Sequence, residues 1–322
     1  MLKKHIISII FLGVASFLGL LFFVIGERTH VVAQSDENII VGSQNYRIVS
    51  FNIPDELVFA GEKVPVELFY VTENLERELI VNTYWHSSTL LLLKRASRWF
   101  PVIEPILKAN GIPEDFKYLS MIESNLTNSK SSAGAVGFWQ FLETTGKEFG
   151  LEINTDVDER YHVEKSTEAA CRYFLKAFDK YKNWALVAAA YNAGSRRIDG
   201  FMNDQMADSY FDMLMAEETE RYLFRMIAMK MIITDPNKYG FYPEFEKLYQ
   251  PLSSSDFIAD TSINNLAEFS KEKGITYKLL KMYNPWLRSN QLIVAAGKRY
   301  IIKLPEGSFK MTHAFIKSKS EE

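Results

Sequence analysis

The chain has 322 residues, a net charge of −3 and an aromatic content of 14%. This length suits about two domains with a substantial core, and the near-neutral charge excludes a global basic field that could hold nucleic acid. Cys171 is the sole cysteine, so no intrachain disulfide can form and a cysteine-based metal site is not expected. The five histidines are scattered without ligand spacing, which argues against a zinc enzyme.

The N-terminus has the pattern of an exported protein. Two lysines precede an uncharged run over residues 6–25, whose length matches the hydrocarbon thickness of a bilayer. The run is long for a signal peptide, yet the small residues ending at Ala33 resemble a cleavage site. Residues 1–33 are therefore predicted to be a signal segment or an inner-membrane anchor, and both alternatives stay open. In either case the rest of the chain is expected in the periplasm or cell envelope.

The middle of the chain is predicted to be mainly α. Residues 34–70 are typical of a linker and irregular segment, because short apolar runs alternate with prolines and a glycine. Helical periodicity then dominates residues 71–245. Within that range Pro101 is expected to open a helix and Ser166 to be an N-cap, and the alanine-rich helix over residues 184–193 is expected at the core.

A second, smaller domain is predicted near the C-terminus. The composition shifts to Pro, Tyr and Ser around residues 241–255, which marks a boundary. Residues 256–305 then show the order strand, helix, helix, strand, and residues 306–322 form a lysine-rich tail. Such a small βααβ unit has little room for an active site, so it is expected to be a binding module or a packing appendage.

Glu123 is the first candidate for catalysis. It follows Phe116 by seven residues and Leu119 by four, so it falls on the same apolar stripe of a predicted helix. Burial of a carboxylate there is costly and raises its pKa, which is the condition for a general acid near neutral pH. Taken alone, Glu123 could equally be a structural residue that caps a neighbouring helix or pairs with an arginine.

Further motifs accompany this glutamate at wide separations. They are Glu-Ser at 123–124 with Ala-Gly-Ala-Val-Gly-Phe-Trp-Gln at 133–140, Ala-Tyr-Asn-Ala-Gly at 190–194, and Glu-Thr-x-x-Tyr at 218–222. Their order and spacing resembles the goose-lysozyme-like catalytic domain of the lytic murein transglycosylases, and in particular the membrane-bound type D branch with its C-terminal LysM repeats. The resemblance covers roughly residues 75–240, and residues 256–305 are similar to a divergent LysM module. It implies a lysozyme-like all-helical domain followed by a small βααβ LysM-like domain.

Site residues follow from this resemblance, position by position. It implies Glu123 as the catalytic acid/base, with a set of substrate-binding residues around the glycan groove: Ser131, Gln140, Tyr191, Asn192, Glu218 and Tyr222. Ser131 matches the position whose hydroxyl orients the N-acetyl group, and Ser132 is an alternative because this loop is one residue short against some relatives. Considered singly, Gln140 and Asn192 could instead only satisfy buried backbone groups, and Tyr191 could be an ordinary core tyrosine.

Three features depart from the family pattern. Trp139 stands where many relatives have Met, which predicts a bulkier groove wall. His162 and Val163 stand where type D relatives often have Asp-Pro. A single LysM-like unit is visible, which predicts weak binding to the wall.

The activity implied is that of a lyase on peptidoglycan glycan strands. It cleaves the β-1,4 bond between N-acetylmuramic acid and N-acetylglucosamine and closes a 1,6-anhydro ring. Most glycosidases use two carboxylates, whereas here Glu123 alone serves, first as acid and then as base, assisted by the substrate's acetamido group. Neither a metal nor an organic cofactor is implied. The inner membrane is a partner only if the N-terminal segment is retained.

Three other functions remain open on the sequence. The first is a lysozyme-like hydrolase on the same fold, in which water attacks and Asp156 or Asp158 supplies a second acid. The second is a non-catalytic, membrane-anchored protein that binds the cell wall. Retention of Glu123 on an apolar stripe argues against that function. The third, a membrane-tethered helical interaction protein, leaves the motifs unexplained.

Overall fold

The structure, a computed structural model, describes residues 49–307. The chain divides into two units, Met1–Val49 and Ser50–Glu322, and the second contains residues 50–307 of the described part. The predicted anchor at residues 6–25 and the tail beyond residue 307 lie outside the described residues. Between residues 49 and 307, none of the helices has the length and apolar character needed to cross a membrane.

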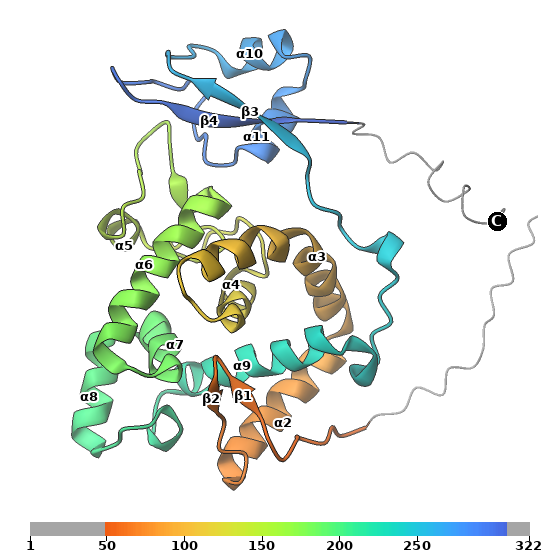
Figure 1. Ribbon diagram of the computed structural model, residues 1–322, viewed down its shortest axis with the longest axis vertical. Helices are drawn as coiled ribbons and strands as arrows, with labels where there is room; N and C mark the ends of the chain where they lie inside the picture. The colour runs from red at the N-terminus through yellow and green to blue at the C-terminus, as the bar shows by residue number, and fades with distance from the viewer. Residues whose placement is uncertain (1–48, 308–322) are drawn as a thin grey trace, which may run out of the picture. The chain divides into compact units, whose positions relative to one another are not determined.

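Helices make up most of this unit, as the sequence predicts (Figure 1). In chain order they are α2 Phe69–Tyr84, α3 His86–Ala109, α4 Lys117–Ser124, α5 Glu143–Glu148, α6 Val163–Tyr181, α7 Trp184–Ala193, α8 Ser195–Gln205, α9 Glu217–Thr234, α10 Leu266–Glu272 and α11 Tyr277–Tyr283. Short 3-10 helices lie between them: η2 Glu114–Phe116, η3 Glu159–Tyr161, η4 Tyr210–Asp212, η5 Pro236–Tyr239 and η6 Phe245–Lys247.

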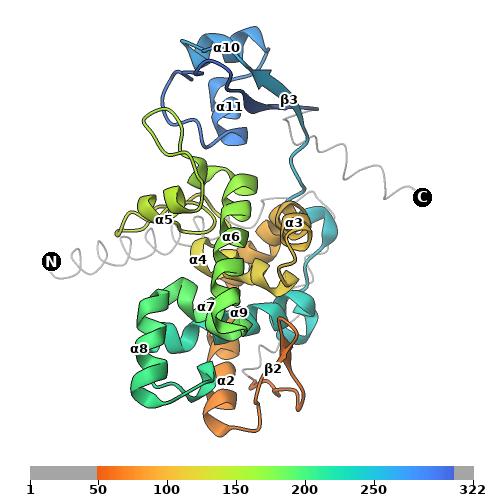
Figure 2. The same cartoon turned by 60° about the vertical axis from the view of Figure 1, so that its left-hand side comes forward.

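Helix α7 lies in the middle of the main apolar core, as expected from its alanines. All residues from 185 to 190 are buried, and α7 packs against α6, α8 and α9. Small side chains let these neighbours approach closely, and Asn183 and Gly194 end the helix on either side. The short helix α4 packs against α3 and α9, and both views show it enclosed among longer helices (Figures 1 and 2).

Part of the segment expected as a linker is built into this fold. Residues Val58–Phe59 (β1) and Glu62–Lys63 (β2) form an antiparallel hairpin, and Phe59 and Val64 are buried in the main core. The Glu62 carboxylate accepts hydrogen bonds from the main-chain N–H groups of Trp184 (2.6 Å) and Ala185 (3.2 Å) at the start of α7. It therefore satisfies free donors and opposes the helix dipole from a distant part of the chain.

This contact predicts a measurable loss of stability. Replacing Glu62 with Ala removes an acceptor at the start of α7 and is expected to cost about 1–2 kcal/mol of unfolding free energy. Urea unfolding followed by circular dichroism would measure it. Glu67→Ala is the matched control, because Glu67 forms an exposed surface ion pair with Lys63 and should change the midpoint little. Equal midpoints for both variants would contradict a capping role.

Two helix boundaries differ from the prediction. Pro101 lies inside α3, not at the start of a new helix, because the helix is held by buried residues on both sides of it, including Phe100 and Ile103. Pro101 and Pro105 both lie inside α3, and each removes one backbone hydrogen-bond donor. Packing can offset this cost. Ser166 is not an N-cap either. Helix α6 begins at Val163, and the buried Ser166 hydroxyl donates to the carbonyl of Val163 within the first turn.

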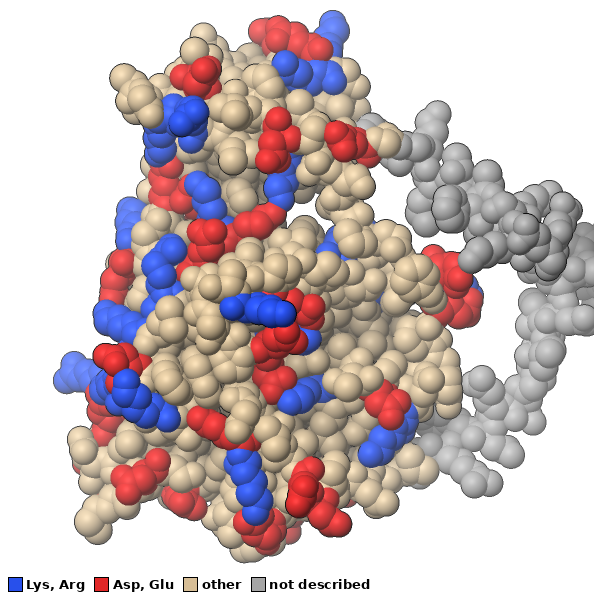
Figure 3. Space-filling view, viewed as in Figure 1, with Lys and Arg blue, Asp and Glu red and all other residues tan. Residues whose placement is uncertain are grey.

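The C-terminal part has the predicted βααβ order. Strand β3 (Ser254–Ala259) pairs antiparallel with β4 (Tyr300–Pro305), with Phe257 opposite Ile302, and α10 and α11 lie between them in sequence. Leu266, Leu280 and Ile302 are fully buried, so this small domain has its own apolar centre. On the face shown in Figure 3, acidic and basic side chains are interspersed across the helical part and this domain.

Candidate active site

Glu123 is the second-last residue of α4, and its helix ends abruptly behind it. Phe116 and Leu119 are fully buried, so the stripe on which the glutamate was predicted does face the core. The chain then turns through two residues in the left-handed region, Asn125 (φ 52°) and Leu126 (φ 53°). Such backbone is costly for residues with a side chain. The turn leaves the Glu123 carboxylate partly buried at a helix end.

A tyrosine on α9 forms a hydrogen bond with this carboxylate. The buried Tyr222 hydroxyl donates a hydrogen bond of 2.5 Å to Oε1 of Glu123, although the two residues are 99 positions apart in the chain. Burial raises the pKa of Glu123, and this outweighs the opposing effect of the Tyr222 hydrogen bond. A carboxyl group with a raised pKa can carry a proton near neutral pH.

Two charges of opposite sign on α9 act on Glu123. The Arg225 guanidinium lowers the pKa of Glu123, and the carboxylate of Glu218 raises it, both by less than burial does. Arg225 also donates to the carbonyl of Ile122, at 3.2 Å. Arg225 was not predicted from the sequence as a site residue. Its spacing of three residues from Tyr222, which places both on one face of a helix, is the signal that could have found it.

Helix α7 brings Tyr191 and Asn192 to the same region. The Tyr191 hydroxyl donates to the carbonyl of Trp139, at 2.6 Å. Burial raises the pKa of Tyr191 well above its ordinary value, and the charge of Glu123 adds to this. Asn192 is half-buried in the last turn, and among residues 49–307 its side-chain amide has no hydrogen-bond partner. That amide is free to meet a ligand.

The loop over residues 129–141 is held by its own side chains. The Gln140 amide nitrogen donates to the carbonyl of Gly137 (2.8 Å) and contacts both the carbonyl and the hydroxyl of Ser129 (3.2 Å each). The Ser131 hydroxyl accepts from the main-chain N–H of Ala135, at 3.0 Å. Ser132 is exposed. The donor groups of Gln140 therefore shape this loop.

The prediction of a bulkier groove wall at Trp139 is wrong. The Trp139 side chain is fully buried, its indole N–H donates to the hydroxyl of Thr167 at 2.9 Å, and its ring packs edge-on against Phe174. An indole gains more from burial with a hydrogen-bond partner than from exposure in a groove. Only the main-chain carbonyl of Trp139 is turned to the site, where Tyr191 binds it.

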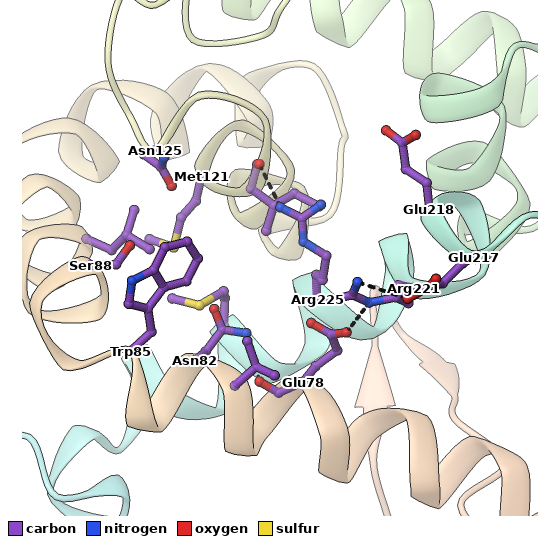
Figure 4. Close-up of a pocket in the computed structure, with 14 residues that line it drawn as sticks. Glu78, Asn82, Trp85, Ser88, Met121, Asn125, Glu217, Glu218, Arg221 and Arg225 are labelled. Atoms are coloured by element: carbon purple, nitrogen blue, oxygen red, sulfur yellow. Dashed lines mark hydrogen bonds and ion pairs between the residues drawn. The ribbon is translucent and has the colours of Figure 1, made fainter.

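A cavity of about 420 Å³ opens beside the end of α4 (Figure 4). Met121 and Asn125 line it from α4, and Arg225 and Glu218 line it from α9. Trp85, at the junction of α2 and α3, faces across this space and is 63% exposed. Trp85 was not predicted as a site residue, because an aromatic residue in a helical pattern gives no signal of its exposure.

Asp158, considered as a second acid for a hydrolase, forms an ion pair with Arg160. Its carboxylate pairs with the guanidinium of Arg160 through two hydrogen bonds, of 2.9 and 2.8 Å, and both residues are buried. Among residues 49–307 no group of three or more His, Cys, Asp or Glu could hold a metal ion. Cys171 is buried, and burial raises the pKa of its thiol to about 12.

Comparison with known proteins agrees with the fold and with the motifs. Residues 101–212 match the family model described as the transglycosylase SLT domain, and residues 256–308 match that of the soluble lytic transglycosylase C-terminal LysM-like domain. The chain thus combines a lysozyme-like SLT domain with a LysM-like domain, as the resemblance implied. These two matches are to domains described in lytic transglycosylases.

One curated relative is the membrane-bound lytic murein transglycosylase D of Escherichia coli K12, 26% identical over 240 residues. The alignment covers 72% of this chain and 51% of that protein, and the protein of the same name from Escherichia coli O6:H1 gives the same figures. The chain therefore spans about half the length of the curated relatives it matches. Among solved structures, an inactive mutant of lytic transglycosylase Slt from Pseudomonas aeruginosa is 16% identical, with a TM-score of 0.35, covering 57% of this chain and 36% of that one.

Proposed function

We propose that this protein is a peptidoglycan lytic transglycosylase that cleaves the bond between N-acetylmuramic acid and N-acetylglucosamine and leaves a 1,6-anhydromuramic end. The observation that carries the proposal is the state of Glu123. It is a partly buried carboxylate with a raised pKa and a tyrosine hydroxyl at 2.5 Å, within the SLT domain, and its neighbour in the chain, Ile122, lines the cavity beside α4.

In the first step, protonated Glu123 gives its proton to the glycosidic oxygen. The leaving sugar departs, and positive charge develops at the muramic anomeric carbon. The acetamido group of the substrate stabilises that centre, so no second protein carboxylate is needed as a nucleophile. Tyr222 supports this step, because its hydroxyl donates to the carboxylate that forms on Glu123.

In the second step, the Glu123 carboxylate accepts the proton of the muramic C6 hydroxyl, and the C6 oxygen closes the anhydro ring. The carboxyl group is thereby reprotonated for another cycle. Tyr191 is expected to accept a hydrogen bond from substrate, because its own proton is donated to the carbonyl of Trp139. The amide of Asn192 is expected to bind the acetamido group or a sugar hydroxyl.

The cavity beside the end of α4 suits part of a glycan strand. Trp85 offers an exposed aromatic face to one side of the cavity, on which a sugar ring can stack. Ser131 and Gln140 hold the loop on which the sugar would rest, and in this proposal their remaining acceptor groups contact it. Glu218 is exposed and lines the same cavity as Trp85.

A hydrolase is the second candidate, and one observation favours it. Glu218 is an exposed carboxylate close enough to raise the pKa of Glu123. A second carboxylate near a catalytic acid can activate water in glycoside hydrolysis. Asp158 cannot take that part while it is bound to Arg160.

Product analysis separates the two functions. Residues 34–322 would be incubated with purified peptidoglycan, and the released muropeptides analysed by mass spectrometry. The expected products end in 1,6-anhydromuramic acid and are lighter by one water than reducing-end products. Reducing ends alone would establish the hydrolase. Binding to the wall without release would favour a non-catalytic wall protein.

Substitutions of Glu218 and Arg225 on α9 should shift the pH dependence of kcat/KM in opposite directions. Because Glu123 must be protonated to act as acid, kcat/KM is expected to fall as pH rises through its pKa. Glu218→Gln removes a negative charge, so the pKa of Glu123 should fall and the alkaline limb should move to lower pH. Arg225→Gln removes a positive charge and should move the limb to higher pH.

The control for this experiment is Arg225→Lys, which keeps the positive charge. Its alkaline limb should stay near that of the wild type even if its kcat is lower. Limbs that do not move in Glu218→Gln or Arg225→Gln would mean that a group other than Glu123 sets the pH dependence.

A place in the cell envelope follows from the proposed substrate. The curated relative is described as membrane-bound, and the apolar run at residues 6–25 would provide an inner-membrane anchor for this chain. The glycan strands of peptidoglycan are the proposed partner.

A further inference from the structure

The catalytic and C-terminal domains are joined by main-chain hydrogen bonds. Val157 and Leu287 form an antiparallel bridge between the two domains. On either side of it, the N–H of Asp158 donates to the carbonyl of Trp286 (2.9 Å), and the N–H of Arg288 donates to the carbonyl of Asp156 (2.7 Å). The C-terminal domain is thus joined by an isolated β-bridge to the segment that precedes η3.

The apolar centre of the C-terminal domain continues into the catalytic domain. Val136, Val157 and Tyr161 are buried in the same cluster as Leu280 and Leu287, not in the main catalytic core. Val136 belongs to the loop over residues 129–141, called the motif loop below because it contains the motif at residues 133–140. Its loop neighbours Phe138, Trp139 and Phe141 are buried in the catalytic core instead. The motif loop is therefore packed between two separate cores.

Polar contacts reinforce the same boundary. Glu152 accepts from Lys298 (2.6 Å) and Tyr300 (2.9 Å), and Glu164 pairs with Lys303. Burial alone would raise the pKa of Glu164, but hydrogen bonds and charges from His162 and Lys303 outweigh it and lower the pKa to about 2. Glu164 is therefore held as a charged partner of the C-terminal domain at neutral pH.

Arg160 links this boundary to the active-site loop. Its guanidinium is bound to Asp158 and donates to the carbonyls of Gly134 (3.3 Å) and Phe141 (3.2 Å). These two residues lie on either side of Gly137 in the motif loop. The main chain of Arg160 packs directly against Gly137 in the middle of that loop. The segment that binds the C-terminal domain is therefore the one that holds the loop in shape.

We propose that the C-terminal LysM-like domain is a fixed support of the active-site loop, and that it sets catalytic turnover independently of any binding to the wall. Val136 and Arg160 are positioning residues in this arrangement. The inference rests on the proposed function, since turnover is its readout. Its physical basis is that the loop carries the Trp139 carbonyl, which orients Tyr191, and that small displacements of positioned groups slow catalysis strongly.

The first test uses the full chain and soluble peptidoglycan oligomers, which need no anchoring to a wall. Val157→Asp places an unpaired charge in the shared cluster and is expected to lower kcat at least about ten-fold with a smaller change in KM. Val157→Ile, which keeps the apolar contact, should retain most of the turnover. Leu175→Asp, at an exposed position on α6, is the matched control and should behave as the wild type.

A second, milder test applies if Val157→Asp does not fold. Lys303→Glu places a carboxylate beside Glu164 and should lower kcat on the same oligomers. Adding Glu164→Gln removes the repulsion and provides an amide donor, so the double variant should recover turnover. Lys182→Glu makes the same charge change beside Asp179, at the end of α6, and should have no effect.

The outcomes are distinct from those of the proposed function. A wild-type protein that releases no anhydro product would overturn the function itself. A wild type that turns over oligomers, with Val157→Asp or Lys303→Glu folded and equally fast, would overturn the supporting role of the C-terminal domain. Loss restored by Glu164→Gln would establish it.

Discussion

Replacing Glu123 with Gln is expected to lower kcat on soluble peptidoglycan oligomers by about 10²–10⁴-fold, the usual contribution of general acid–base catalysis. The amide cannot carry the proton to the glycosidic oxygen or take one from the C6 hydroxyl. The fold should persist, because an amide oxygen can still accept the hydrogen bond from Tyr222. Release of anhydro-muropeptides, followed by mass spectrometry, measures the effect.

Two controls belong with this variant. Glu148→Gln makes the same chemical change in an exposed ion pair with Lys176 and should leave kcat unchanged. Binding of the Glu123→Gln protein to glycan should also be retained, since only the proton transfer is removed. Turnover at the wild-type rate in the variant would show that Glu123 is not the catalytic acid.

Replacing Gly137 with Ala is expected to have the largest effect on stability. A Cβ atom there would lie 2.0 Å from the carbonyl oxygen of Arg160, which is main chain and cannot swing aside, and the residue has φ +81°. Overpacking typically costs about 1–3 kcal/mol, and left-handed backbone adds about 1–2 kcal/mol. We therefore expect a loss of about 3 kcal/mol in unfolding free energy, with loss of activity.

Gly134→Ala is the matched control in the same loop. Gly134 has nearly the same backbone conformation, φ +83°, but no atom lies within 4 Å of its added Cβ. Only the backbone strain of about 1 kcal/mol should remain. Guanidinium unfolding of both variants gives the comparison. Equal losses would mean that contact with Arg160 contributes nothing at Gly137.

Local patterns were sufficient for the helical class and for the βααβ domain. Apolar spacing placed Glu123 on a buried stripe, and the alanine-rich run at residues 184–193 predicted helix α7. Local patterns failed where packing overrode propensity. Pro101 is inside α3, and Trp139 is in the core although its position in the motif predicted the groove. The partners of the Trp139 ring, Thr167 and Phe174, are distant from it in the chain.

The sequence by itself determined which residues could carry the chemistry: a carboxylate at a helix end, a glycine-rich loop, and the Tyr191-Asn192 pair, each recognisable within a few residues. Only the tertiary structure decided which groups meet them. Tyr222 and Arg225 reach Glu123 from α9, and Val136 is buried against the C-terminal domain. The physical reason is that hydrogen bonds, charge effects and burial act through space. These effects come from residues that are distant in the chain, and local periodicity does not indicate which distant residues will be in contact.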